Sequence, residues 1–158
     1  MSTAESSTTD TRRLLALVDG KHDCLVRLAE SCRQQQELIE SGDITQLLGV
    51  LAAKQRTLGE LQEFERELDP FRHDDPQRRV WSGDAERLRC ASLAERSAHL
   101  LSEILDGEKR CEEALRRRRD DAAGQLAAVQ SAGATRGAYF DSSAAPYSAS
   151  TLDLTSDR

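Results

Sequence analysis

Three successive residues, His73, Asp74 and Asp75, are the most plausible chemical group in the sequence. A histidine beside two carboxylates could bind a divalent metal or activate a water molecule. The triplet lies between two prolines, however, and a metal hydrolase needs further ligands that converge from elsewhere. The other histidines, His22 and His99, lack a partner in a recognised ligand motif. We therefore expect a solvated loop here and no metal site.

No other motif in the sequence indicates catalysis. There is no nucleophile elbow of the form G-x-S-x-G and no phosphate-binding loop of the form G-x-x-x-x-G-K-[ST]. A catalytic pocket needs a concave cavity with convergent polar groups, and a narrow bundle of leucine and alanine offers little volume for one. We expect a protein that is not an enzyme, with no catalytic residues and no cofactor.

Four consecutive arginines, Arg116–Arg119, form a second charged feature. Such a run could contact phosphates, but consecutive residues point in different directions around a helix. Acidic residues bracket the run at spacings that allow pairing on the helix surface: Glu112, Glu113, Asp120 and Asp121. The net charge of −6 gives no general attraction to nucleic acid. We expect an exposed, self-neutralised face that does not bind nucleic acid.

The composition indicates how such residues are positioned. The chain has 158 residues, of which 38% are hydrophobic and 32% charged, but only 4% are aromatic. A chain with so few aromatic side chains has to bury thin seams of leucine and alanine instead of a thick core. The composition therefore predicts long helices that touch along stripes, in an all-α fold.

The first predicted helix covers about residues 10–41, with Asp10 as its N-cap and residues 1–9 disordered. Apolar residues recur there at alternating spacings of four and three, with Lys21 and Gln35 at two seam positions. Gly42 can adopt the left-handed conformation that closes this helix, and Asp43 can cap the next one. The sequence predicts an antiparallel helical hairpin.

The second predicted helix covers about residues 44–68, and its seam carries Lys54 and Glu65 at polar positions. Asp69-Pro70 marks its end, because proline disfavours helical geometry in the residue before it. Residues 69–82 are expected to form a loop. Its large side chains are expected to cap one end of the helix pair: Phe71, Val80 and Trp81.

The third predicted helix covers about residues 84–131 and is far longer than the second. The segment from Leu115 to Val129 must therefore extend past the hairpin or find another surface. From residue 132 to residue 158 the chain is rich in alanine, serine and glycine, which predicts a flexible tail.

The N-terminal residues are rich in serine and threonine and lack the basic start and apolar run of a secretory signal. We expect a cytoplasmic protein that is not inserted in a membrane. The four cysteines lie far apart within helical patterns and form no C-x-x-C pair: Cys24, Cys32, Cys90 and Cys111. We expect them to be reduced residues that pack in the core.

In the central stretch, residues 38–43 read Leu-Ile-Glu-Ser-Gly-Asp, and a leucine-rich helix with an internal Lys54-Gln55 and then Glu65 follows. This stretch resembles the FlgN family of flagellar export chaperones. The first two helices of that family meet at a similar Gly-Asp turn. By architecture the resemblance extends over about residues 12–130, and by pattern over residues 38–65.

The resemblance implies a cytoplasmic, non-enzymatic chaperone for type III export. Proteins of this family keep the hook-filament junction proteins unassembled until the flagellar export apparatus takes them. They engage their clients through the C-terminal part of the long helix and the segment that follows. Carried over to this chain, the expected partner-binding residues are Leu115, Leu126, Val129 and, by a loose match to an aromatic residue of the family, Tyr139.

Two other interpretations stay open at the level of sequence. The third helix could pair with its own copy, which would make the protein a coiled-coil scaffold that homodimerises and has no export client. Less favoured is a helical protein that associates with nucleic acid through the arginine run. The chaperone interpretation predicts a monomer or a weak homodimer, whereas the scaffold interpretation predicts a stable dimer.

Overall fold

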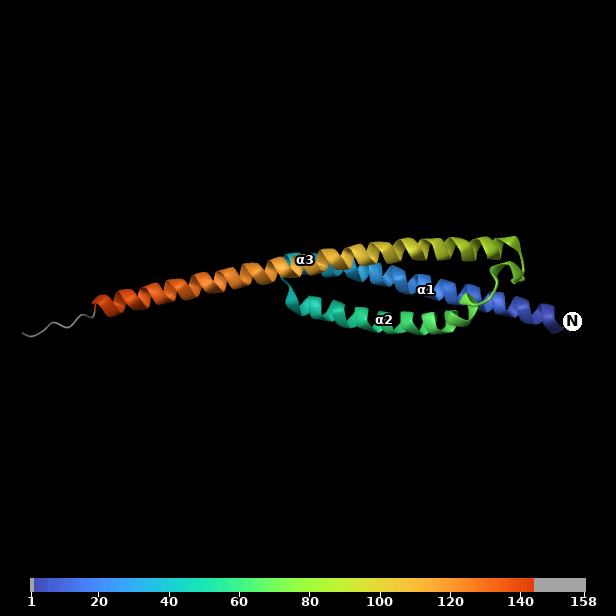
Figure 1. Ribbon diagram of the computed structural model, residues 1–158, viewed down its shortest axis with the longest axis horizontal. Helices are drawn as coiled ribbons and strands as arrows, with labels where there is room; N and C mark the ends of the chain where they lie inside the picture. Colours follow the sequence, from blue (N-terminus) through green and yellow to red (C-terminus); the bar gives the residue numbers. More distant parts are fainter. Residues whose placement is uncertain (1, 144–158) are drawn as a thin grey trace, which may run out of the picture. The chain divides into compact units, whose positions relative to one another are not determined.

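The chain is all-helical, as the sequence predicts (Figure 1). A computed structural model describes residues 2–143, with side chains described from residue 7 onward. The elements are α1 (Ser2–Ser41), α2 (Ile44–Arg72), a single turn of 3₁₀ helix, η1 (Pro76–Arg78), and α3 (Asp84–Ser143). By internal contacts the chain divides into an N-terminal unit, Met1–Arg116, and a C-terminal unit, Arg117–Arg158.

The turn between α1 and α2 is built as predicted. Gly42 has φ of 76°, a conformation that glycine adopts without steric cost. The carboxylate of Asp43 accepts a hydrogen bond from the backbone N–H of Gln46 at 3.1 Å, which caps the first turn of α2. These two residues reverse the chain and start the antiparallel hairpin.

Polar residues in the seam set the register of the hairpin. The ammonium of Lys21 lies 2.6 Å from the carboxylate of Glu65, and the ammonium of Lys54 donates to the amide oxygen of Gln35 at 3.2 Å. These are the four polar seam positions of the sequence pattern. They pair across the hairpin because residue numbers rise along α1 as they fall along α2.

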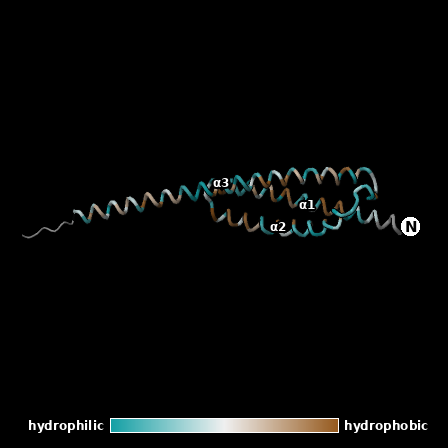
Figure 2. The backbone as a smooth tube through the Cα atoms, viewed as in Figure 1, coloured by the Kyte–Doolittle hydropathy of each residue, from teal (hydrophilic) through white to brown (hydrophobic). Residues whose placement is uncertain are grey.

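Helix α1 is the central element of the N-terminal unit, and α2 and α3 pack against it (Figure 1). The buried side chains form three clusters along the unit. The central cluster contains Leu25, Leu28, Ala29, Cys32 and Ile104. One end cluster contains Leu14, Leu17, Leu68 and Cys90, and the cluster near the turn contains Ile39, Leu47 and Cys111. Figure 2 shows the hydrophobic residues of α1 and of the start of α2 that supply much of this core.

All four cysteines are buried and none forms a disulfide, in agreement with their predicted packing role. Burial raises the pKa of each thiol, and it raises that of Cys32 to about 12 with the help of a hydrogen bond to Glu108. The thiols are therefore protonated near neutral pH and behave as small apolar groups.

The predicted end of the second helix is wrong. Helix α2 continues through Pro70 to Arg72. The proline removes only one backbone donor in the last turn, and two contacts hold that turn in place. Phe71 packs on the cluster that contains Leu14, and Arg72 forms an ion pair with Glu65. Tertiary packing thus outweighs the local cost of the proline.

The loop after α2 is accordingly shorter than predicted. Of the three side chains expected to cap the bundle, Phe71 and Trp81 pack against the end cluster. Val80 does not, because its side chain is exposed; its carbonyl instead accepts a hydrogen bond from the buried hydroxyl of Thr11 at 2.8 Å. This bond ties the loop to α1.

The outer helix limits also differ from the prediction. Helix α1 begins at Ser2, so Asp10 lies inside it and is not its N-cap. Helix α3 runs to Ser143 instead of residue 131, because the alanine-rich segment has high helix propensity despite its glycines. The remainder of the predicted tail, residues 144–158, lies outside the described residues. No helix in the described part is both long and apolar enough to cross a membrane.

Candidate partner-binding face

The C-terminal part of α3 exposes its apolar side chains. Every described residue from Leu115 to Ser143 is exposed. Within the C-terminal unit, the side chains with the largest apolar area are exposed by more than half: Leu126 by 59%, Val129 by 68%, Phe140 by 70% and Tyr139 by 76%. An array of large apolar groups in water is the usual mark of an interaction surface.

The spacing of these residues places most of them on one side of the helix. Starting at Ala122, small or apolar residues recur at intervals of four, three, four and seven residues. At about 100° per residue, the five positions fall within about 60° of one another. We call this set the stripe: Ala122, Leu126, Val129, Gly133 and Phe140.

The stripe contains two of the predicted partner-binding residues. Leu126 and Val129 lie together on it, as the partner-binding prediction requires. Tyr139 precedes Phe140 by one residue and therefore points about 100° away, so it flanks the stripe instead of belonging to it. Phe140 is not among the residues predicted from the sequence but lies on the stripe, and its spacing from Gly133 is the signal that could have identified it.

A shallow hollow of about 430 Å³ lies at the far end of the stripe. It is lined by Thr135, Arg136, Tyr139 and Phe140. The two aromatic rings provide its apolar walls, and the guanidinium of Arg136 provides a charge at its edge. Such a hollow can receive a side chain from a partner that lies along the helix.

Leu115, the fourth predicted residue, belongs to the N-terminal unit and is 43% exposed. It lies one turn after Cys111, which is fully buried in the cluster near the α1–α2 turn, and next to Ala114, which packs on that cluster. Leu115 therefore marks the point along α3 at which burial in the N-terminal unit ends.

The arginine run is exposed and partly neutralised by neighbours. Arg116 pairs with Glu112 at 2.9 Å across one helical turn, and Arg119 lies 3.4 Å from the carboxylate of Asp120. The first contact has the expected four-residue spacing, whereas the second joins adjacent residues. Exposed pairs of this kind contribute little to stability and leave the guanidiniums accessible to other groups.

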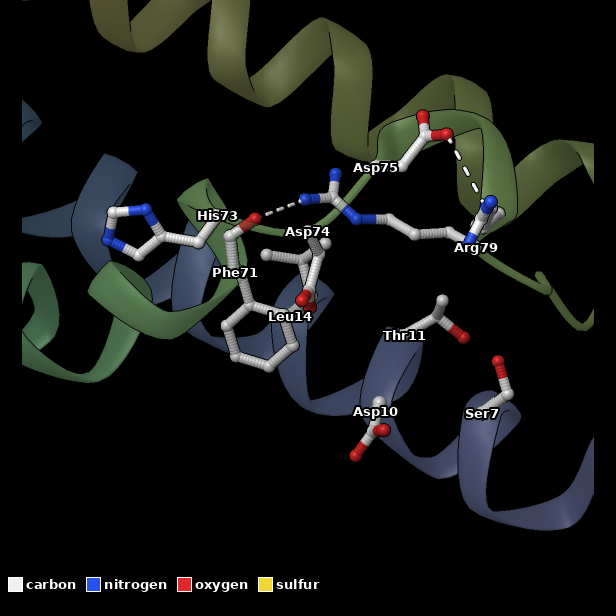
Figure 3. A pocket seen from close by; sticks show the side chains of 10 residues that line it. Ser7, Asp10, Thr11, Leu14, Phe71, His73, Asp74, Asp75 and Arg79 are labelled. Carbon is white, nitrogen blue, oxygen red and sulfur yellow. Dashed lines mark hydrogen bonds and ion pairs between the residues drawn. The ribbon is translucent and has the colours of Figure 1, made fainter. Parts of the chain in front are cut away.

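The His73-Asp74-Asp75 triplet lies at the surface after the end of α2. All three residues are exposed, and they line a hollow of about 430 Å³ between the start of α1 and the loop (Figure 3). The dominant contact there is structural: the guanidinium of Arg79 donates to the carbonyl of Phe71 at 2.6 Å. Among the described residues, no group of three histidine, cysteine or acidic side chains could hold a metal ion.

A polar network joins all three helices of the N-terminal unit. The ammonium of Lys54, whose side chain is 13% exposed, contacts both Gln35 and Glu108. The thiol of Cys32 donates to Glu108 at 3.1 Å. Burial alone would raise the pKa of Glu108, but the hydrogen bonds from Lys54 and Cys32 lower it. The network holds a charged pair between helices.

A groove of about 320 Å³ lies along the packed helices of the N-terminal unit. Its apolar lining includes Val18, Phe71, Ala98 and Leu101, and the sequence pattern did not indicate it. The hydroxyl of Ser97 is buried beside it and makes no hydrogen bond within the described part of the chain. No charged group lies at hydrogen-bond distance from this hydroxyl in the described part of the chain.

Comparison of the chain with known protein families, with curated proteins and with solved structures finds no match. Functional assignment therefore depends on the molecule itself. In the described part of the C-terminal unit, the stripe is an exposed row on a helix whose apolar spacing is typical of a packed helix.

Proposed function

We propose that the protein is an export chaperone or adaptor that holds an amphipathic helix of its client along the stripe of α3. The observation that carries this proposal is the exposure of Leu126 and Val129, at 59% and 68%, on a helix with regularly spaced apolar positions. A second amphipathic helix would bury these side chains by packing its own seam against them. The proposal needs no cofactor.

The resemblance to FlgN-type chaperones supplies the client class. Its members hold hook-filament junction proteins, whose terminal helices pair with one another after export. A chaperone that offers a substitute helical stripe would keep those helices from pairing early. Leu115, Leu126, Val129 and Tyr139 are the residues that we propose contact the client, and the stripe adds Phe140.

Binding of purified hook-filament junction protein, measured by titration calorimetry, tests this proposal. Leu126→Asp should weaken binding on the order of 100-fold, because the complex would bury an unpaired carboxylate. Ala127→Asp is the matched control: it adds the same charge one residue away, about 100° round the helix from the stripe. Equal affinities of the two variants, or no binding by the unmodified chain, would refute the proposed function.

Each binding measurement includes a control that the variant is correctly folded. Trp81, the single tryptophan, packs on the end cluster of the N-terminal unit. Its fluorescence should be the same in both aspartate variants, which would show that the hairpin and the packed part of α3 are intact. Loss of that signal together with binding would contradict the separate roles assigned to the two regions.

A further inference from the structure

The spacing of residues along the stripe is symmetric about its midpoint. A surface that binds an unrelated helix does not require such a symmetry. Its intervals of four, three and four residues read the same in both directions about the midpoint between Ala127 and Ala128. Leu115 and Phe140 extend the symmetry, because each lies seven residues beyond the four inner positions. We infer that this part of α3 pairs with a second copy of itself in antiparallel orientation.

The side-chain sizes agree with this register. An antiparallel pair centred on that midpoint brings Leu126 opposite Val129 of the second copy, twice by symmetry. Ala122 then lies opposite the second copy's Gly133, so that small residues meet small ones. In the outermost layer Leu115 meets Phe140. Large residues thus face large ones and small residues face small ones, which lets two helices pack closely in these layers.

Charge favours the antiparallel over the parallel arrangement. A parallel, in-register pair would set the run Arg116–Arg119 against the same four arginines of the other chain. In the antiparallel pair the two runs are about 30 Å apart, well beyond the screening length of about 8 Å at physiological salt. Each run then lies opposite residues 136–139 of the second copy, so that Arg116 meets the aromatic ring of Tyr139, and the carboxylate of Asp141 lies two residues further along.

One layer of the antiparallel pair is unfavourable. Arg119 lies opposite Arg136 of the second copy, and this happens twice in the symmetric dimer. The carboxylate of Asp120, 3.4 Å from Arg119, offsets part of that repulsion. We therefore expect a dimer that forms and dissociates, in which a client helix can replace the second copy. Only this competition rests on the proposed function, because the self-pairing needs no client.

Sedimentation equilibrium of the full chain, over about three orders of magnitude in concentration, tests the pairing. A monomer–dimer equilibrium is expected. Leu126→Asp should raise the dissociation constant on the order of 1,000-fold, because the charge enters the symmetric interface twice, whereas Ala127→Asp should leave it within about threefold. A monomer at every concentration, or a dimer unaffected by Leu126→Asp, would overturn the inference.

Oxidative cross-linking tests the orientation. Ala122→Cys and Gly133→Cys are separate variants, and each is expected to stay uncross-linked because equivalent positions lie about 16 Å apart. A mixture of the two variants should form a disulfide between them. Cross-linking of each variant with itself would instead show a parallel pair and overturn the register. The unmodified chain, with its four buried cysteines, gives the background.

Charge reversal provides an independent check. Arg136→Glu should tighten the dimer about tenfold, because it places a carboxylate opposite Arg119 in both copies. In a parallel pair the same variant would set two glutamates against each other and give no gain. Failure of the self-pairing leaves client binding in calorimetry untouched, and failure of client binding leaves the dimer untouched, so the two proposals fail separately.

Discussion

Helix α3 contains two regions with similar apolar spacing and opposite burial. In the N-terminal unit, Leu93, Ile104 and Cys111 are buried against other helices. In the C-terminal unit, Leu126 and Val129 recur at comparable helical spacing and are exposed. A periodic apolar pattern therefore specifies which side of a helix is to be buried, but not which chain supplies the covering surface.

The two regions also differ in the polar groups that accompany the apolar ones. The packed region contains Lys54 and Glu108 in a network that crosses three helices. Along the exposed region, Arg119 forms its ion pair with the adjacent residue of the same helix, Asp120. Pairs between elements fix a unique arrangement, whereas pairs within one helix leave its face available to a partner.

Hydrogen exchange should show the largest contrast between the regions. Amides around Leu28 in α1 are expected to exchange only through global unfolding, whereas amides around Leu126 exchange through local opening of a helix without a packed side. At low protein concentration the difference should reach at least about 1,000-fold. Mass spectrometry of exchanged peptides measures it, and equal protection of the two regions in the monomer would contradict their assignment.

Matched truncations sharpen the comparison in energetic terms. Leu25→Ala should lower the free energy of unfolding by about 2–5 kcal/mol, because Leu25 is fully buried in the central cluster. Leu126→Ala should change it by less than about 0.5 kcal/mol. Urea unfolding followed by Trp81 fluorescence reports on the N-terminal unit for both variants. A large loss with Leu126→Ala would show that its side chain has a partner within the monomer.

Much of the fold could be predicted from the sequence because its signals are local. Gly42 and Asp43 specify the turn by backbone conformation and capping, and both are confirmed. Lys21 and Gln35 are polar residues in the apolar seam of α1. Their partners on α2, Glu65 and Lys54, are polar residues in the seam of that helix. Pro70 failed as a signal, since the packing of Phe71 on α1 holds the last turn of α2, and such a distant contact leaves no local trace.

The candidate site was only partly predictable, for a related reason. Leu126 and Val129 could be identified because apolar residues recur at the helical period whether the face that they form is buried or exposed. Phe140 was assigned to a flexible tail, since the many serine, glycine and alanine residues after residue 131 are typical of a flexible segment. The composition therefore gave no sign that α3 continues to Ser143. The groove beside Ser97 could not be predicted, because it arises from the way three helices pack and not from any motif.

Breaking the polar network should have an intermediate effect. Lys54→Ala leaves Gln35 and Glu108 without their ammonium partner in a largely buried position, so we expect a loss of about 1–3 kcal/mol in the free energy of unfolding. Arg66→Ala removes an exposed pair with Glu63 and should cost less than about 0.5 kcal/mol. Urea unfolding measures both, and similar small losses would show that the network does not stabilise the packed region.

The pH dependence of stability gives the finest test of the same network. The folded-state pKa of Glu108 is lowered by its bonds with Lys54 and Cys32, so those bonds stabilise the fold above the usual carboxyl pKa of about 4.3. The stabilisation is lost as the pH falls through the lowered pKa. The Cys32 thiol, with its pKa raised to about 12, stays protonated over this range.

Glu108→Gln should therefore have a smaller drop in urea midpoint than the unmodified chain when the pH is lowered from near neutral to below about 4. Glu63→Gln, at an exposed pair, is the control and should keep the original dependence. Glu60 and Glu65, whose pKa values are also lowered, continue to titrate in both variants and contribute to the remaining slope. If Glu108→Gln and Glu63→Gln show the same drop in urea midpoint as the pH is lowered, the carboxylate of Glu108 is solvated in the folded protein. The packed region would then resemble the exposed one in its electrostatics and differ from it only in apolar burial.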